Sequence, residues 1–164
     1  MLLYVMRHGP AEDGAPSGRD FDRALTASGR ELVALAARHL AKTRSAPLPR
    51  ILSSPLVRAR QTSEIVRSLV CSPDTSIEFD DDLQPRDAPP LTLAHDVMTS
   101  GLDTLVVGHQ PSVEYLVRSL VPHPNLPLAR GFRTAMIVGL APDEARHGLW
   151  TTELVVDPRE PESA

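Results

Sequence analysis

The chain has 164 residues, of which 41% are hydrophobic and 23% are charged, and its net charge is −4. These values are typical of one soluble globular domain with a core of its own. The negative net charge argues against binding to nucleic acid or to an anionic membrane. The aromatic content of only 4% also argues against a protein that stacks nucleic-acid bases. Cys71 is the only cysteine, so an internal disulfide is excluded. With no long apolar run and no basic leader, we expect a cytoplasmic protein without a membrane segment.

The first apolar run, Leu2 to Met6, predicts a strand buried on both faces of a sheet. A loop rich in Gly, Pro and charge follows from Pro10 to Arg23. A helix is then expected from about Leu25, with either Thr26 or Ser28 as its N-cap. The N-terminal part therefore reads as a strand, a long loop and a helix.

The rest of the chain continues the alternation of strands and helices. The predicted strands are 50–53, 77–79, 102–107, 134–140 and 149–156, the predicted helices are 54–69, 92–100 and 111–120, and the longer loops are 80–90 and 122–130. The second helix is expected to use Ser54 as its cap and Pro55 in its first turn. This order predicts an α/β fold, a three-layer α/β/α sandwich with a largely parallel central sheet. We expect one domain over residues 1–157 and a polar, frayed tail over 158–164.

Two predicted strands each end in a histidine. Arg7-His8-Gly9 follows the first strand, and Gly108-His109 follows the strand at 102–107. Ligands bind at the carboxyl ends of the strands in open α/β sheets. The pattern therefore predicts one site that contains two imidazoles.

Arg58 lies in the first turns of the helix that follows the strand at 50–53. Arg7 and Arg58 would offer two planar donor groups that match the oxygens of a phosphoryl group. A neutral imidazole nitrogen can attack phosphorus and form a covalent phosphohistidine, and a second imidazole can donate a hydrogen bond to the phosphoryl oxygens. These residues predict phosphoryl transfer through His8, with no metal and no other cofactor.

Three motifs, in this order and spacing, give the chain a family resemblance: Arg7-His8-Gly9, the segment Ser-Pro-Leu-Val-Arg-Ala-Arg-Gln-Thr at 54–62, and Gly108-His109. With them the chain resembles the histidine phosphatases of the phosphoglycerate mutase-like superfamily. The resemblance implies that His8 is the nucleophile and that Arg7, Arg58 and His109, together with Gly9, bind the phosphate.

Over residues 1–157 the chain is most similar to phosphohistidine phosphatases of the SixA type. That resemblance implies a phosphohistidine-containing protein as partner, either a phosphotransfer domain or a phosphocarrier, or else a small phosphorylated substrate. We expect a monomer, because no long apolar stripe marks an interface.

One departure from the larger family members bears on the substrate. They usually carry an acidic residue in the middle region, whereas this chain reads Leu83-Gln84-Pro85, with Asp82 and Asp87 only flanking it. A sugar alkoxide needs a proton as it leaves, but imidazole has a conjugate acid with a pKa of about 6.5 and needs less help. A phosphohistidine substrate is therefore favoured. Two alternatives stay open: a metabolite phosphomonoesterase that uses Asp82 or Asp87 as its acid, and a non-enzymatic module that binds phosphohistidine.

Other polar residues near the motifs have simpler interpretations. Arg60 is expected on the solvated face of its helix, and Gln61 and Thr62 are expected to make local contacts. Four charged residues of the first loop are also expected to be solvated, although they could line the site: Arg19, Asp20, Asp22 and Arg23.

Overall fold

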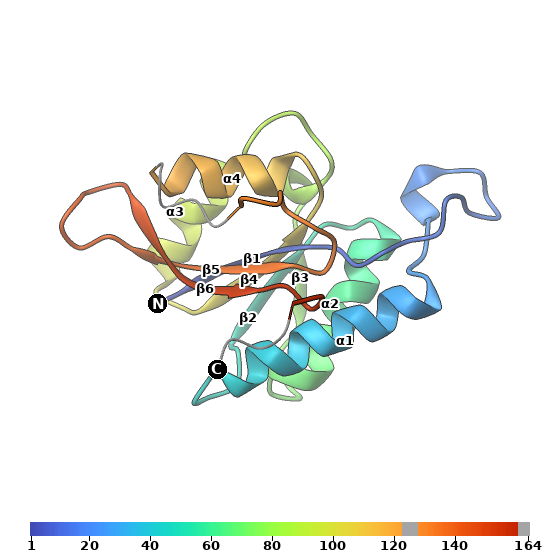
Figure 1. Cartoon of the computed structure of the whole chain (residues 1–164), viewed down its shortest axis with the longest axis horizontal. Coiled ribbons are helices and arrows are strands. Elements are labelled where there is room, and N and C mark those ends of the chain that lie inside the picture. The colour runs from blue at the N-terminus through green and yellow to red at the C-terminus, as the bar shows by residue number, and fades with distance from the viewer. Residues whose placement is uncertain (123–127, 161–164) are drawn as a thin grey trace.

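The computed structural model describes residues 1–122 and 128–160 (Figure 1). Its strands are β1 (Leu3–Arg7), β2 (Arg50–Ser53), β3 (Ile77–Phe79), β4 (Thr104–Gly108), β5 (Ile137–Pro142) and β6 (Trp150–Val156). Its α-helices are α1 (Ala27–Lys42), α2 (Val57–Val70), α3 (Leu91–Ser100) and α4 (Ser112–Leu120), and two short 3₁₀ helices are η1 (Asp20–Asp22) and η2 (Asp81–Leu83). None of the helices in these ranges is long and apolar enough to cross a membrane.

The strands form one six-stranded sheet in the order β3-β2-β4-β1-β5-β6. The β3–β2, β2–β4 and β4–β1 pairs are parallel, and the β1–β5 and β5–β6 pairs are antiparallel. The predicted, largely parallel α/β sheet is confirmed. The β5–β6 pair is antiparallel because the short connection between the two strands leaves no room for a crossover helix.

Helices cover both faces of the sheet, so the fold has three layers (Figure 1). Strand β1 shows the reason, because its side chains alternate between two apolar clusters. Leu3 and Val5 pack in a cluster with residues of α3 and α4, whereas Tyr4 and Met6 pack in one with residues of α1 and α2. A strand with an apolar side chain at every position can be buried only between two helical layers.

The start of α1 matches the sequence, whereas the start of α2 does not. Thr26 is the N-cap of α1, and its side chain accepts a hydrogen bond from the Gly29 N–H at 2.8 Å. The prediction that Ser54 caps α2 is wrong, because the helix begins at Val57 and its N-cap residue is Leu56. Pro55 therefore precedes the helix rather than occupying its first turn. The side chain of Ser54 contacts a different part of the fold, the residue that follows β4.

The end of the described chain is better ordered than the sequence suggests. Ion pairs join Arg133 to Asp157 and to Glu160, and Arg159 donates hydrogen bonds to the backbone and hydroxyl oxygens of Thr134. The expectation of a frayed tail is wrong for residues 158–160. Residues 161–164, and residues 123–127 of the predicted loop at 122–130, lie outside the described part.

Candidate active site

The register of two neighbouring strands brings the predicted histidines together. Arg7 of β1 is paired with Gly108 of β4, and the backbone N–H of His8 donates to the Gly108 carbonyl at 3.0 Å. The next residue on each strand is a histidine. The centroids of the His8 and His109 rings are 5.0 Å apart. The two imidazoles therefore lie next to each other at the carboxyl edge of the parallel strands, as the strand ends predicted.

The orientation of the His8 ring is fixed by its own backbone. Its Nδ1 lies 2.7 Å from the carbonyl oxygen of Gly9, which can only accept a hydrogen bond. Nδ1 therefore carries a hydrogen, and in the neutral ring the lone pair is on Nε2. Gly9 is itself held, because its N–H donates to the Thr62 hydroxyl of α2 at 3.0 Å. A side chain at this glycine would collide with α1, since a Cβ would lie 2.4 Å from a methyl carbon of Val33.

His109 is held by the residue that follows β2. Its Nε2 lies 2.8 Å from the Ser54 hydroxyl, which also accepts a hydrogen bond from the Leu56 N–H at 3.3 Å. The Ser54 hydroxyl can donate its hydrogen to His109 Nε2, and in that arrangement the hydrogen of the neutral His109 ring is on Nδ1. Nδ1 is buried and has no hydrogen-bond partner within the described residues. His109 can therefore present an N–H donor to a ligand.

Arg58 projects from the first turn of α2 and is almost fully buried, with 5% of the residue exposed. Its two terminal nitrogens are both held by Asp20 of η1. One donates to the Asp20 backbone carbonyl at 3.0 Å, and the other to the carboxylate at 3.1 Å. Its third nitrogen, Nε, is buried and is left unpaired by residues 1–122 and 128–160.

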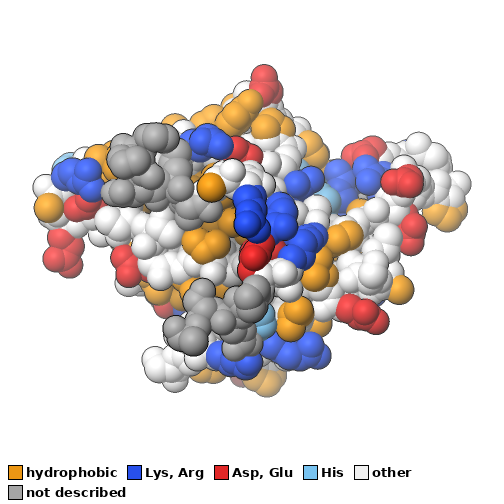
Figure 2. All heavy atoms as spheres, viewed as in Figure 1, with side chains coloured by type: hydrophobic (Ala, Val, Ile, Leu, Met, Phe, Trp, Pro, Cys, Tyr) orange, Lys and Arg blue, Asp and Glu red, His pale blue; other side chains and the backbone are white. Residues whose placement is uncertain are grey.

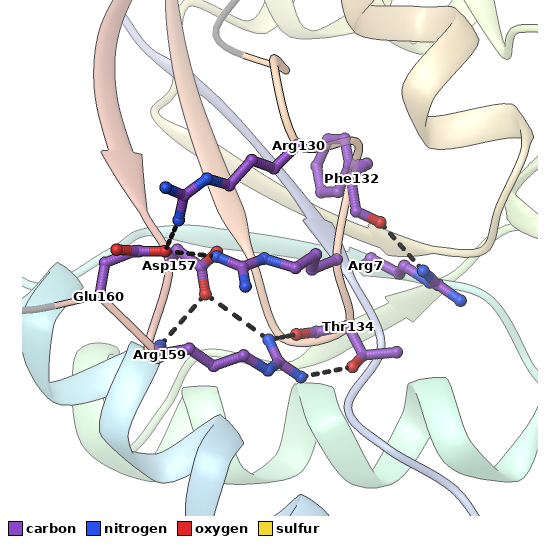
Figure 3. A network of polar contacts seen from close by, with 8 residues as sticks. Arg7, Arg130, Phe132, Thr134, Asp157, Arg159 and Glu160 are labelled. Carbon is purple, nitrogen blue, oxygen red and sulfur yellow. Dashed lines mark hydrogen bonds and ion pairs between the residues drawn. The ribbon is translucent and has the colours of Figure 1, made fainter.

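Arg7 is held by the segment that leads into β5 (Figure 3). One of its terminal nitrogens donates to the Phe132 carbonyl at 3.0 Å, and its Nε is buried with no partner in the part of the chain that the structure describes. The C-terminal ion pairs anchor this segment, because Arg133 binds Asp157 and Arg130 binds Glu160 at 2.6 Å. Residues far from Arg7 in the chain thus support its side chain.

The site concentrates positive charge and unpaired donors. Three of its buried nitrogens have no partner within the described chain: Arg7 Nε, Arg58 Nε and His109 Nδ1. Buried donors are almost always paired in proteins, so donors left unpaired in one place indicate a ligand with several acceptor oxygens. On the surface, Lys and Arg side chains also gather toward the long N-terminal loop, apart from a second group at the centre of the same face that has acidic side chains beside it (Figure 2). The arrangement is suited to an oxyanion such as phosphate.

Burial among these cations keeps both histidines neutral. Burial lowers the pKa of His8 to about 4, and the charges of Arg58, Arg7 and Arg23 contribute to this effect. Burial likewise lowers the pKa of His109 to about 2, with the neighbouring His8 as the next cause. A neutral His8 has the Nε2 lone pair that a nucleophile requires, and a neutral His109 can be the hydrogen-bond donor.

The comparisons with known proteins agree with this geometry. Residues 3–94 match the model of the histidine phosphatase superfamily (branch 1). The chain is 33% identical over 157 residues to the phosphohistidine phosphatase SixA of Escherichia coli, with 94% of this chain and 93% of that protein covered. It belongs to the histidine phosphatase superfamily.

Solved structures of SixA proteins have the same fold as this histidine phosphatase. The structure of the protein histidine phosphatase SixA complexed with tungstate has a TM-score of 0.80 at 32% identity, and the match covers 96% of this chain and 97% of that one. The putative phosphohistidine phosphatase SixA from Agrobacterium tumefaciens has a TM-score of 0.77 at 27% identity, with 96% and 98% covered. Both the sequence and the fold place the chain among phosphatases, which are hydrolases.

Two residues of the long N-terminal loop, for which the sequence favoured a solvated position over one that lines the site, contact residues of the pocket. Asp20 binds Arg58, and Arg23 is close enough to His8 to lower its pKa. Arg23 is fixed there by hydrogen bonds to the Asp20 carboxylate at 2.8 Å and to the Glu12 carbonyl at 2.6 Å. The expectation that both are merely solvated is wrong. Arg19 and Asp22 pair with each other at 2.7 Å as solvated charges, as expected.

The sequence around Asp20 and Arg23 gives little sign of their position, because Arg19 and Asp22 are equally charged residues of the same loop. Ser54 is a further residue that contacts the pocket. Its position between a strand and a helix suggested a cap, and only the fold shows that it contacts His109. Of the neighbouring minor predictions, the one for Arg60 is confirmed, because Arg60 pairs with Glu64 on the helix surface. The expectation of purely local contacts is wrong for Gln61 and Thr62, because Gln61 accepts a hydrogen bond from the Leu25 N–H and Thr62 accepts one from the Gly9 N–H.

The two carboxylates considered as a general acid have other partners. Asp82 pairs with Arg86 at 3.0 Å, and Asp87 accepts a hydrogen bond from the Tyr115 hydroxyl at 3.1 Å. In residues 1–122 and 128–160, the hydrogen bonds and ion pairs of Asp82 and Asp87 include none to Arg7, His8, Arg58 or His109. Within the same ranges, no group of three or more His, Cys, Asp or Glu side chains is placed to hold a metal ion.

Proposed function

We propose that this protein is a phosphohistidine phosphatase that works through a covalent intermediate on His8. One observation carries the proposal: the Nδ1–H of His8 is bonded to the Gly9 carbonyl, which leaves the lone pair on Nε2, and His8 lies among the half-buried Arg7, the buried Arg58 and the donor His109. A nucleophile surrounded by oxyanion-binding donors is the arrangement that phosphoryl transfer needs.

In the first step, the lone pair of His8 Nε2 attacks phosphorus and forms a P–N bond. The bond between phosphorus and the substrate nitrogen breaks, and its electron pair leaves with the substrate imidazole, which takes up a proton from solvent water. Arg7 Nε, Arg58 Nε and His109 Nδ1 donate to the three phosphoryl oxygens while the charge on them shifts. The Nδ1–H bond to Gly9 keeps Nε2 directed at the phosphoryl group throughout.

In the second step, water attacks the phosphorus of phospho-His8. The P–N bond breaks, inorganic phosphate leaves, and the attacking water releases a proton to solvent. This proton offsets the one that the substrate imidazole took up in the first step. His8 returns to its neutral state with the hydrogen still on Nδ1. The same donors serve both steps, because each step passes through a similar distribution of charge on the phosphoryl oxygens.

The chemistry of the leaving group supports a phosphohistidine substrate. Asp82 pairs with Arg86, and Asp87 accepts a hydrogen bond from Tyr115. Within the described residues, neither carboxylate contacts the pocket residues in a way that would let it protonate a leaving alkoxide. Imidazole leaves readily, because its conjugate acid has a pKa of about 6.5. The similarity to SixA, a phosphohistidine phosphatase, points in the same direction. We propose a phosphotransfer domain or a phosphocarrier protein as the substrate.

The experiment that tests the mechanism uses a protein phosphorylated on histidine with radioactive phosphate. Wild-type protein should release phosphate and, when quenched with alkali, should carry acid-labile label. Replacing His8 with Asn keeps much of the size of the side chain but removes the nucleophile, and should lower phosphate release by at least about 1,000-fold and abolish labelling. His147→Asn, in the exposed turn between β5 and β6, is the matched control and should behave as wild type. Unchanged turnover in His8→Asn would contradict the proposal.

A further inference from the structure

Asp20 is the carboxylate that binds the arginines of the pocket. Its Oδ2 accepts from Arg58 at 3.1 Å, and its Oδ1 accepts from Arg23 at 2.8 Å. Its backbone carbonyl accepts a second hydrogen bond from Arg58 at 3.0 Å. One residue of the loop thus supplies an acceptor to each terminal nitrogen of Arg58 and links it to Arg23.

These contacts leave part of the Arg58 guanidinium available. A guanidinium has five N–H donors, and the two contacts with Asp20 use one on each terminal nitrogen. The Nε–H is buried, and no acceptor in the described ranges reaches it. Asp20 therefore occupies the outer end of the group and leaves the nitrogen nearest the chain to a ligand.

The electrostatic environment gives a reason for this contact. Arg58 is almost fully buried, while 61% of the Asp20 side chain is exposed, so the carboxylate reaches from the solvent side onto a desolvated cation. Burial lowers the pKa of Arg58, and the Asp20 charge opposes that effect. A buried cation without a counter-charge is costly and would tend to turn away from its neighbours. Asp20 compensates Arg58 without occupying its Nε.

We propose that Asp20 is a positioning residue, which holds Arg58 by its two terminal nitrogens so that Nε faces the transferred phosphoryl group. Asp20 touches neither the phosphoryl group nor the nucleophile and acts only through Arg58. Through the same carboxylate it fixes Arg23, so that the loop at 10–23 becomes part of the pocket wall. This role rests on the proposed phosphatase function but does not depend on which phosphorylated substrate is used.

The test is a double-mutant cycle read by tungstate affinity and by steady-state kinetics. Asp20→Ala should weaken tungstate binding and lower kcat/KM, each by about 10-fold, because a misdirected donor group loses much of its effect. Asp20→Asn keeps an acceptor oxygen and should recover part of the loss. Asp22→Ala is the matched control, since Asp22 lies in the same short helix η1 but pairs with Arg19, and should stay within about twofold of wild type.

Repeating the Asp20 substitution in an Arg58→Lys protein tests whether Asp20 acts by positioning Arg58 or by an effect on the whole pocket. Lysine has no Nε–H to be oriented, so Asp20→Ala should change tungstate affinity by less than about twofold in that background. Urea unfolding of each variant shows that it is folded at the assay temperature, and Asp20→Asn replaces Asp20→Ala in the cycle if the latter does not fold.

Three results would overturn the proposal. Tighter tungstate binding in Asp20→Ala would mean that Asp20 competes with the anion. An equal loss in the wild-type and Arg58→Lys backgrounds would mean that Asp20 does not act through Arg58, and no loss would mean that it has no role. Tungstate binding is independent of the substrate, so a failure of the phosphohistidine assay alone would count against the proposed function and not against this role of Asp20.

Discussion

The chemistry of the site depends on which nitrogen atoms of two buried histidines carry hydrogens. The Gly9 carbonyl fixes His8 with its hydrogen on Nδ1, and Ser54 favours the same tautomer for His109. Burial of both rings lowers their pKa values well below the ordinary value for histidine. The neutral state that makes His8 a nucleophile is therefore maintained at a cost that should be visible in the stability of the protein.

We expect the free energy of unfolding to fall as the pH falls below about 6.5, the pKa of histidine in the unfolded chain. Below that pH, His8 and His109 bind protons in the unfolded chain but stay neutral in the folded protein. This difference persists until the pH falls below the folded pKa, which is about 4 for His8 and about 2 for His109. Each group should add a slope of up to about 1.4 kcal/mol per pH unit in this range. Urea unfolding of wild type and His8→Asn between about pH 5 and about pH 6.5 measures the difference.

Averaged over this range, the His8→Asn variant should show a slope smaller by about 1 kcal/mol per pH unit, because Asn does not titrate and the unfolded histidine is only half protonated at about pH 6.5. Carboxylates influence both proteins equally, so the comparison isolates the histidine. Parallel stability curves for the two proteins would show that His8 has an ordinary pKa in the folded state and is partly protonated near neutral pH. In that case burial could not be the reason that His8 is nucleophilic.

The juxtaposition of the two histidines could be predicted because each directly follows a strand, and the fold brings their rings to a centroid distance of 5.0 Å. The catalytic roles of His8, His109, Arg7 and Arg58 stay predictions. For Asp20 and Arg23 the sequence favoured a solvated position over one that lines the site, because their place depends on how the loop from Pro10 to Arg23 folds back over α2. Such a path is set by long-range contacts and not by a local pattern.

At the scale of single elements, the N-terminus of α1 shows what sequence patterns can decide and what they leave open. Thr26 and Ser28 were equally acceptable as N-caps. In the structure the Thr26 side chain accepts from the Gly29 N–H, whereas Ser28 lies inside the first turn of the helix. The helix also packs tightly there, because a Cβ on Gly29 would lie 2.1 Å from the Pro10 carbonyl oxygen. The start of α1 thus fixes the beginning of the loop that carries Asp20.

We expect Thr26→Ala to lower the free energy of unfolding by about 1 kcal/mol, the usual value of a side-chain N-cap. Ser28→Ala is the matched control at the neighbouring exposed position and should cost less than about 0.5 kcal/mol. Urea unfolding at neutral pH measures both. Equal losses in the two variants would show that the cap is shared, and a larger loss in Ser28→Ala would contradict the assignment of Thr26.

At the start of α2, a local rule gave a wrong result for a functional reason. Ser-Pro before a helix normally indicates a cap followed by proline in the first turn. Here Ser54 bonds His109, which follows a neighbouring strand, and the helix starts only at Val57. The side chain that would stabilise the helix is used to orient a site residue.

At the scale of the whole molecule, the alternation of strands and helices was enough to predict the three-layer α/β fold. The order β3-β2-β4-β1-β5-β6 was not predictable in the same way, because strand order is set by which apolar faces meet and not by any single segment. The order matters for function. It places β1 next to β4 and β4 next to β2, so that His8, His109 and Ser54 emerge side by side.

The charge distribution of the whole pocket also bears on the substrate. The site holds cations and hydrogen-bond donors, and the carboxylate that contacts them, Asp20, has a lowered pKa because of Arg23 and Arg58. A carboxylate that is ionised at neutral pH cannot protonate a leaving alkoxide. The alternative function, hydrolysis of metabolite phosphomonoesters, would require Asp82 or Asp87 to leave its present partner and act as the acid.

The most direct test is to compare phosphate release from a phosphohistidine-bearing protein with release from a panel of sugar phosphates under identical conditions. We predict a kcat/KM at least about 100-fold higher for the P–N substrate, because imidazole leaves without the acid that an alkoxide needs. The Asp82→Asn and Asp87→Asn variants should retain this activity. Comparable or faster turnover of the sugar phosphates, lost in either variant, would contradict the proposed function and establish a metabolite phosphatase.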